Sequence, residues 1–184
     1  GKSTGGKGGS ITLSVGEGNT GIGGDVTVNA GITSASDNTG GAVTIASGKG
    51  TATSSGAVSI STSDGGTAGV SGNIGLTTGD TADGNTGTIA FTSGKSTGGK
   101  GGSITLSVGE GDTGIGGDFS VNAGNTIADS GTTGGKVLLQ SGESALTSSG
   151  EFTLSTPNAG LAGVSGNLGL TSGTSSVGNS GTIA

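Results

Sequence analysis

Large apolar residues recur along this chain at fixed distances after a series of glycines. Two residues after each of twelve glycines stands Ile, Val, Leu or Phe, and four residues after eleven of them stands another. The residues between are mostly small or polar, so the pattern alternates with a period of two, which predicts a strand with one buried face. These opening glycines are Gly9, Gly24, Gly41, Gly56, Gly72, Gly87, Gly102, Gly117, Gly135, Gly150, Gly166 and Gly181.

We call the two sets of apolar positions the first and second apolar columns. The first column comprises Ile11, Val26, Val43, Val58, Ile74, Ile89, Ile104, Phe119, Val137, Phe152, Leu168 and Ile183. The second comprises Leu13, Val28, Ile45, Ile60, Leu76, Phe91, Leu106, Val121, Leu139, Leu154 and Leu170.

The chain also repeats on a larger scale. Residues 94–111 are identical to residues 1–18, and the two halves then stay in register with small changes. Consecutive opening glycines lie 15–18 residues apart, and six of them make one large repeat of 93 or 94 residues. Repeats this short bury a core only by stacking. The sequence therefore predicts an all-β fold, a β-solenoid of about twelve 15–18-residue rungs, with one six-rung block at 1–93 and a continuous second block at 94–184.

The remaining residues of each repeat are expected to turn the chain and close the core. Glycine pairs such as Gly8-Gly9 and Gly23-Gly24 precede the expected strands, where sharp corners need the positive φ that glycine tolerates. The few apolar residues outside the columns, among them Ile22, Ala68 and Val70, are expected to form the facing wall of a narrow core.

The composition argues against several classes of function. The chain has 47 Gly, 27% hydrophobic residues and three Phe as its only aromatic residues, with a net charge of −6. It offers neither a basic patch nor an aromatic stacking platform, so we expect no nucleic-acid partner. No apolar run approaches the ~20 residues of a membrane span. The chain lacks Cys, so it has no disulfide framework.

The residue types that most often carry out catalysis are scarce. The chain has no His and no Cys, so the common nucleophile–base pairs cannot form. Asp80 and Asp83 share one expected turn, but the second copy has Thr174 and Val177 there, and Asp is a common turn residue. The closely spaced Asp residues of calcium-binding loops do not occur. We therefore expect no enzyme and predict no catalytic, cofactor-binding or metal-ligating residue and no cofactor.

Four charged or apolar residues are candidates for contacts on the outer surface of the solenoid. Lys136 falls between Asp118 and Glu151 in one outward column, where neighbouring rungs would pair the charges, with a contribution of only about 0–1 kcal/mol. Leu138 is expected to point outward as well. It would then be a lateral contact, a site of decoration or a harmless exposed apolar residue.

Two longer turns, Gly31–Gly40 and Gly124–Gly134, occur once per block. Insertions in solenoids map to one face and often carry binding, so we expect contacts with neighbouring filaments or glycans there. No Asn-x-Ser/Thr sequon occurs, so O-linkage to Ser or Thr is the expected form of any glycosylation.

The segments SGAVSISTSDGGTAGVSGNIGLTTG (residues 55–79) and GGSITLSVGEG (residues 8–18) resemble very large Gly/Ser/Thr-rich repeat proteins of microalgae such as diatoms. The resemblance extends over the whole chain, and bacterial filamentous adhesins are a more distant likeness. It implies an extracellular or cell-surface setting and assigns no functional residue.

These observations together predict a structural protein that forms an extracellular or cell-surface fibril. Ala184 stops in the middle of an expected strand, so we expect either covalent continuation into further repeats or head-to-tail self-association. A rigid adhesin stalk is the main alternative. Ice binding is a third, but the outward column that begins at Thr12 is interrupted by Gly75, Ala90 and Leu138, so a flat Thr lattice is absent.

Overall fold

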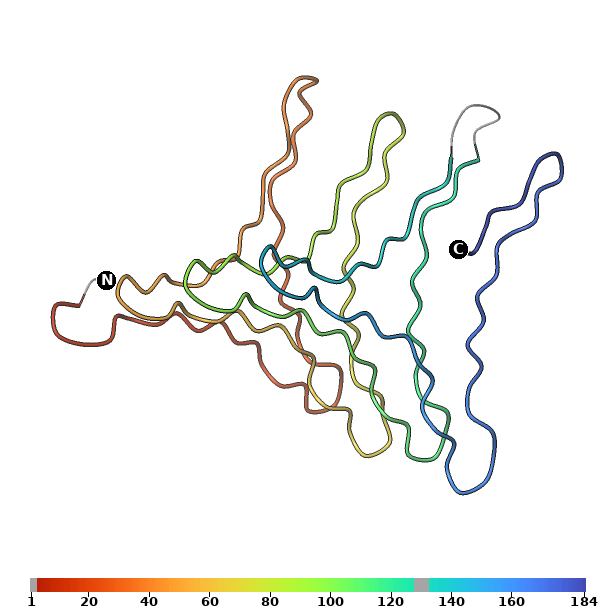
Figure 1. Cartoon of the computed structure of the whole chain (residues 1–184). Coiled ribbons are helices and arrows are strands. Elements are labelled where there is room, and N and C mark those ends of the chain that lie inside the picture. The colour runs from red at the N-terminus through yellow and green to blue at the C-terminus, as the bar shows by residue number, and fades with distance from the viewer. Residues whose placement is uncertain (1–2, 128–132) are drawn as a thin grey trace. The chain divides into compact units, whose positions relative to one another are not determined.

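The computed structural model describes residues 3–127 and 133–184. Over these two ranges the chain contains no α-helix and no β-strand, and Figure 1 accordingly shows neither coiled ribbons nor arrows. The prediction of an all-β fold, a β-solenoid with stacked rungs, is therefore wrong. The alternating pattern of apolar and polar residues is present in the sequence, but within the described ranges the segments that carry it do not form a sheet.

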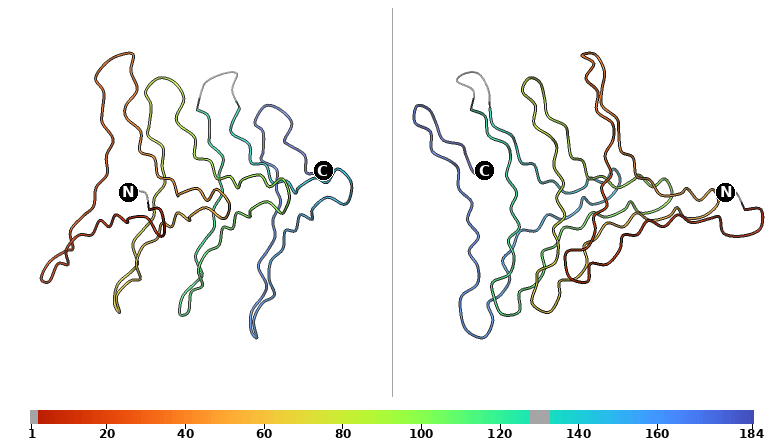
Figure 2. Two further views of the ribbon diagram at one scale, coloured as in Figure 1. Left: turned by 90° about the vertical axis from the view of Figure 1, so that its left-hand side faces the viewer. Right: turned by 180° about the vertical axis from the view of Figure 1, so that it is seen from behind.

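The chain divides into two units, Gly1–Phe91 and Thr92–Ala184, and each is considered by itself. Within each unit the backbone runs as extended segments joined by loops (Figure 2). We call the seven residues that begin at an opening glycine a leg, and the residues up to the next opening glycine a loop. The predicted blocks 1–93 and 94–184 rest on the sequence repeat and remain a prediction.

Each loop brings the next opening glycine against the last residue of the preceding leg. At eleven opening glycines, a Cβ added to the glycine would lie within 4 Å of that residue's side chain. The same closure thus recurs around loops that differ in length and sequence. The pairs are Gly24 with Val15, Gly41 with Ala30, Gly56 with Ser47, Gly72 with Thr62, Gly87 with Thr78, Gly102 with Ser93, Gly117 with Val108, Gly135 with Ala123, Gly150 with Ser141, Gly166 with Thr156 and Gly181 with Ser172.

Close approach accounts for glycine at two of the opening positions, Gly24 and Gly117, whereas a Cβ added at Gly87, Gly166 or Gly181 would make only ordinary contacts of 3.5 Å or more. In the part of the chain that the structure describes, positive φ angles occur at Gly84 (105°) and Gly163 (128°), and neither is an opening glycine. A Cβ added at Gly117 would instead lie 2.8 Å from Val108 Cγ1, too close for two carbon atoms. The expectation that the opening glycines serve corners of positive φ is therefore corrected.

Four of the loops are also closed by a backbone hydrogen bond. In each, the N–H of the opening glycine donates to the carbonyl of the residue that follows the preceding leg, at 2.8 or 2.9 Å. The bonds occupy equivalent places in the two sequence repeats, so they follow from the local sequence. They are Gly41 to Gly31 and Gly135 to Gly124 at 2.8 Å, and Gly56 to Gly48 and Gly150 to Gly142 at 2.9 Å.

No hydrophobic residue of the described ranges is buried. Apart from Ile11, the side chains of the two apolar columns remain 47–75% exposed. Ile22 and Val70, expected to form a facing wall, are 93% and 94% exposed, so that expectation is wrong. A folded monomer of this mass exposes about 7,600 Å², whereas this chain exposes 17,880 Å². The columns therefore lack an opposing apolar surface, which is the physical reason that no solenoid core forms.

The loop closure can be tested with a single methyl group. We expect Gly117→Ala to open its loop, because the new Cβ would lie 2.8 Å from Val108 Cγ1 and the two residues must move apart. In two-dimensional NMR the nuclear Overhauser effect between residue 117 and the Val108 methyl groups should weaken several-fold. Gly116→Ala is the matched control, since a Cβ there meets nothing within 4 Å. Equal behaviour of the two variants would contradict the close approach.

Candidate functional site

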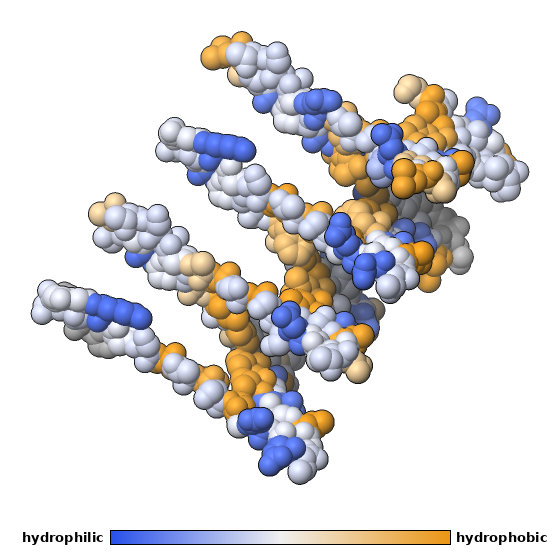
Figure 3. All heavy atoms as spheres, turned by 90° about the horizontal axis from the view of Figure 1, so that it is seen from below, coloured by the Kyte–Doolittle hydropathy of each residue, from blue (hydrophilic) through white to orange (hydrophobic). Residues whose placement is uncertain are grey.

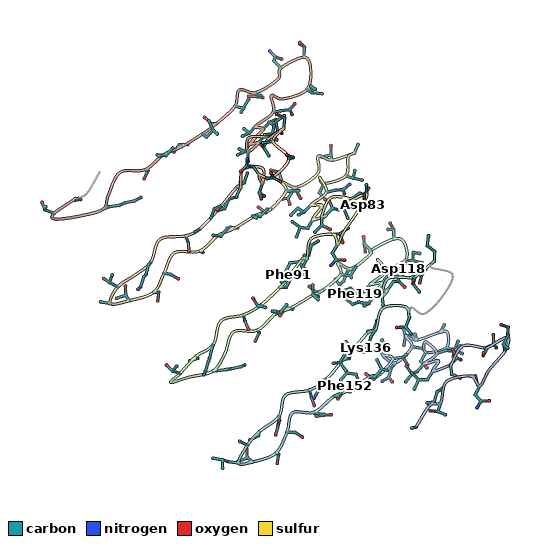
Figure 4. The ribbon with its side chains drawn as sticks, turned by 90° about the horizontal axis from the view of Figure 1, so that it is seen from above. Asp83, Phe91, Asp118, Phe119, Lys136 and Phe152 are labelled. Atoms are coloured by element: carbon teal, nitrogen blue, oxygen red, sulfur yellow. The ribbon has the colours of Figure 1, made fainter. Side chains whose placement is uncertain are left out.

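The loop that follows Thr78 carries Asp80 and Asp83, the two carboxylates that the sequence places in one turn. The chain bends at residues 82–84, where Figure 4 labels Asp83, and the Thr81 hydroxyl donates to the Asp83 carbonyl at 3.0 Å. Among the described residues, no group of three or more His, Cys, Asp and Glu side chains could hold a metal ion. Asp83 thus occupies a bend stabilised by a local hydrogen bond.

A shallow hollow lies on the loop after Val108, and sequence reasoning did not anticipate it. Its lining comprises Glu110, Gly111, Asp112 and Gly116. The first repeat has Asn19 where the second has Asp112, and this change was the one signal in the sequence that marked the loop. Both carboxylates are exposed. Two exposed carboxylates without further ligands do not make a binding site.

The charge pairs expected around Lys136 do not form. Glu151 accepts a hydrogen bond from the hydroxyl of Thr153, two residues along the same leg, at 2.6 Å. Figure 4 shows Asp118 and Lys136 on separate legs. The pairs required rungs stacked in register. Since the described chain has no stacked rungs, the outward column that would bring these charges together does not exist.

Leu138 was expected to point outward while its neighbours pointed inward. The structure leaves Val137, Leu138 and Leu139 exposed at 52%, 65% and 70%. The leg therefore has no buried face against which an outward direction can be defined. A contact or decoration role for Leu138 remains a prediction.

Both long turns are closed at their base by the backbone bonds described above. In the first turn the Ala35 N–H also donates to the Thr33 hydroxyl at 3.2 Å, and the Asn38 N–H donates to the Ala35 carbonyl at 3.4 Å. Part of the second turn, residues 128–132, lies outside the described residues. Their expected contacts with filaments or glycans remain predictions.

No family model, no curated protein and no solved structure matches this chain. The likeness to microalgal repeat proteins, and the more distant one to adhesins, therefore stay predictions. In the described ranges, no helix has the length and apolar character needed to cross a bilayer.

The feature that recurs with the greatest regularity is the leg itself. Figure 3 shows the hydrophobic residues mostly along the legs, while pale and blue residues make up most of the loop tips. The apolar loop residues Ile115 and Leu146 are 94% and 95% exposed, whereas the column residues of the legs other than Ile11 are partly shielded. The legs are thus the part of the surface with an organised apolar character.

Proposed function

We propose that this chain is a structural protein of the cell surface or the extracellular matrix, and that it contributes to fibres rather than to catalysis. The observation that carries the proposal is the repetition of one geometry: eleven loops close in the same way, glycine against the end of the preceding leg. A repeated surface of this kind presents the same contact many times along one chain. That multiplicity suits a fibre, in which many weak contacts act together.

The exposure of the described residues does not favour an enzymatic function. Enzymes stabilise transition states with oriented groups in sites from which water is excluded. Small-molecule sites are likewise concave and largely apolar. In the part of the chain that the structure describes, the least exposed residues are only intermediate in burial. This openness supports a role in which the whole surface, rather than one pocket, makes the contacts.

The two alternative functions each require a feature that the structure does not supply. A rigid stalk needs a continuous core or hydrogen-bond ladder to resist bending, and the described residues contain neither. Ice binding needs a flat array of Thr side chains, and extended legs outside a sheet provide no such plane. No observation favours either alternative.

An antibody raised against residues 1–18 provides a sensitive test, because residues 94–111 present the same epitope a second time. We expect immunogold labelling of intact source cells to mark fibres or matrix outside the plasma membrane. Permeabilised cells serve as the control for internal protein. Labelling that appears only after permeabilisation would overturn the proposed location and function.

A further inference from the structure

The legs differ from the loops in charge as well as in apolar character. Of the twelve legs, four carry one charged residue each, always directly after the opening glycine: Asp25, Asp118, Lys136 and Glu151. The other eight have none. Ser10–Val15 and Ser103–Val108 have the same sequence, SITLSV, which combines β-branched and apolar residues without charge, Pro or Gly. Short segments with this composition pair with identical segments of other chains and interlock their side chains.

The backbone of these legs is available for contact. Among the described residues, the backbone–backbone hydrogen bonds lie at turns or at loop closures, and none has both its donor and its acceptor in one leg. Leu13 and Leu106 are 75% and 72% exposed. The SITLSV legs therefore present both unpaired peptide groups and apolar side chains, the two features that make an extended segment a template for another chain.

The exposed area is large enough for extensive association. The chain exposes 17,880 Å², about 10,000 Å² more than a folded monomer of its mass. A standard protein–protein interface buries about 1,600 Å² in total. Pairing of several legs could therefore remove much apolar surface from water without changing the loops.

We propose that the partner of the SITLSV legs is a second copy of this chain, and that Ser10–Val15 and Ser103–Val108 are the primary contacts. A second copy is the occupant that the sequence favours, because each chain presents the same segment twice and identical segments place like side chains against each other. The contact lies between chains and requires no core within one chain. The net charge of −6 on each copy opposes the association of two copies, and salt weakens this repulsion. The inference rests on the proposed structural role, for which it names the partner.

The test places a charge in both primary contacts of the full 184-residue chain. In the variant Leu13→Lys with Leu106→Lys, we expect the concentration needed for assembly to rise at least tenfold, measured by sedimentation velocity over a dilution series. The matched control is Ile22→Lys with Ile115→Lys, which adds the same charge at loop positions that are 93% and 94% exposed. It should change that concentration less than threefold.

Both double variants have a net charge of −4, since two Lys residues add two positive charges to −6. A difference between them therefore reports position rather than charge. A wild-type chain that stays monomeric at every concentration would overturn the inference and point to another occupant, such as a different protein or a polysaccharide. Equal loss of assembly in both variants would overturn the role of the SITLSV legs. Neither result alters the immunogold labelling, so the proposed function is tested independently.

Discussion

A dilute solution of this chain should show no cooperative heat-absorption peak over about 10–90 °C. This interval includes the temperatures at which ordinary domains unfold. A globular domain of 184 residues would absorb about 130 kcal/mol at its midpoint, with a heat-capacity increase of about 2–3 kcal/mol/K. Both quantities scale with the surface that unfolding exposes. Because the described chain holds no buried hydrophobic residue, we expect less than about a tenth of that enthalpy.

Differential scanning calorimetry makes this measurement, and a concentration series is its control. A peak that appears and grows only as the chain is concentrated would report dissociation of assembled copies, which is consistent with pairing of the legs. A single sharp peak of about 130 kcal/mol that is independent of concentration would contradict the open structure, because only a cooperative core produces it.

Chymotrypsin should cut the native chain after all three phenylalanines almost as fast as it cuts unfolded peptides. Phe91, Phe119 and Phe152 lie in legs and are 65%, 64% and 57% exposed. In a folded domain with 5–15 kcal/mol of stability, a buried cleavage site is protected by a factor of at least about 10³. Here we expect protection of less than about tenfold, because cleavage requires no prior unfolding.

Two comparisons make the proteolysis result specific. Adding moderate urea should scarcely accelerate cleavage of the dilute chain, whereas it accelerates cleavage of a folded domain strongly. Raising the chain concentration should slow cleavage in the wild type as legs become covered, but not in the Leu13→Lys, Leu106→Lys variant. Strong protection of the three sites in dilute solution would contradict the exposed legs.

The positions of the legs and loops could be read from the sequence. The opening glycines and the apolar columns mark the legs, and the structure shows extended segments there with loop closures at eleven of those glycines. Local sequence suffices for this result because the glycine and the small or β-branched residue that it contacts are separated by one short loop. Val108 against Gly117 and Val15 against Gly24 are equivalent contacts in the two repeats.

The reason for each opening glycine could not be read from the sequence in the same way. Glycine is favoured both by positive φ and by close approach of a neighbouring side chain, and composition does not separate these causes. The structure separates them at Gly117, where an added Cβ would lie 2.8 Å from Val108 Cγ1 and φ is not positive. The charge pairs expected around Lys136 failed for a related reason, since they depended on an arrangement of rungs that periodicity alone does not establish.

The sequence by itself determined the repeat, the legs, the scarcity of catalytic side chains and the low charge of the apolar segments. Only the tertiary structure decided that, in the described ranges, these segments remain exposed. Apolar residues at every second position indicate that one face of an extended segment is apolar. Burial of that face requires a second apolar surface opposite it. Ile22 and Val70 were among the residues expected to form that surface, and they are 93% and 94% exposed. Without an opposing wall, apolar alternation yields open legs rather than a core.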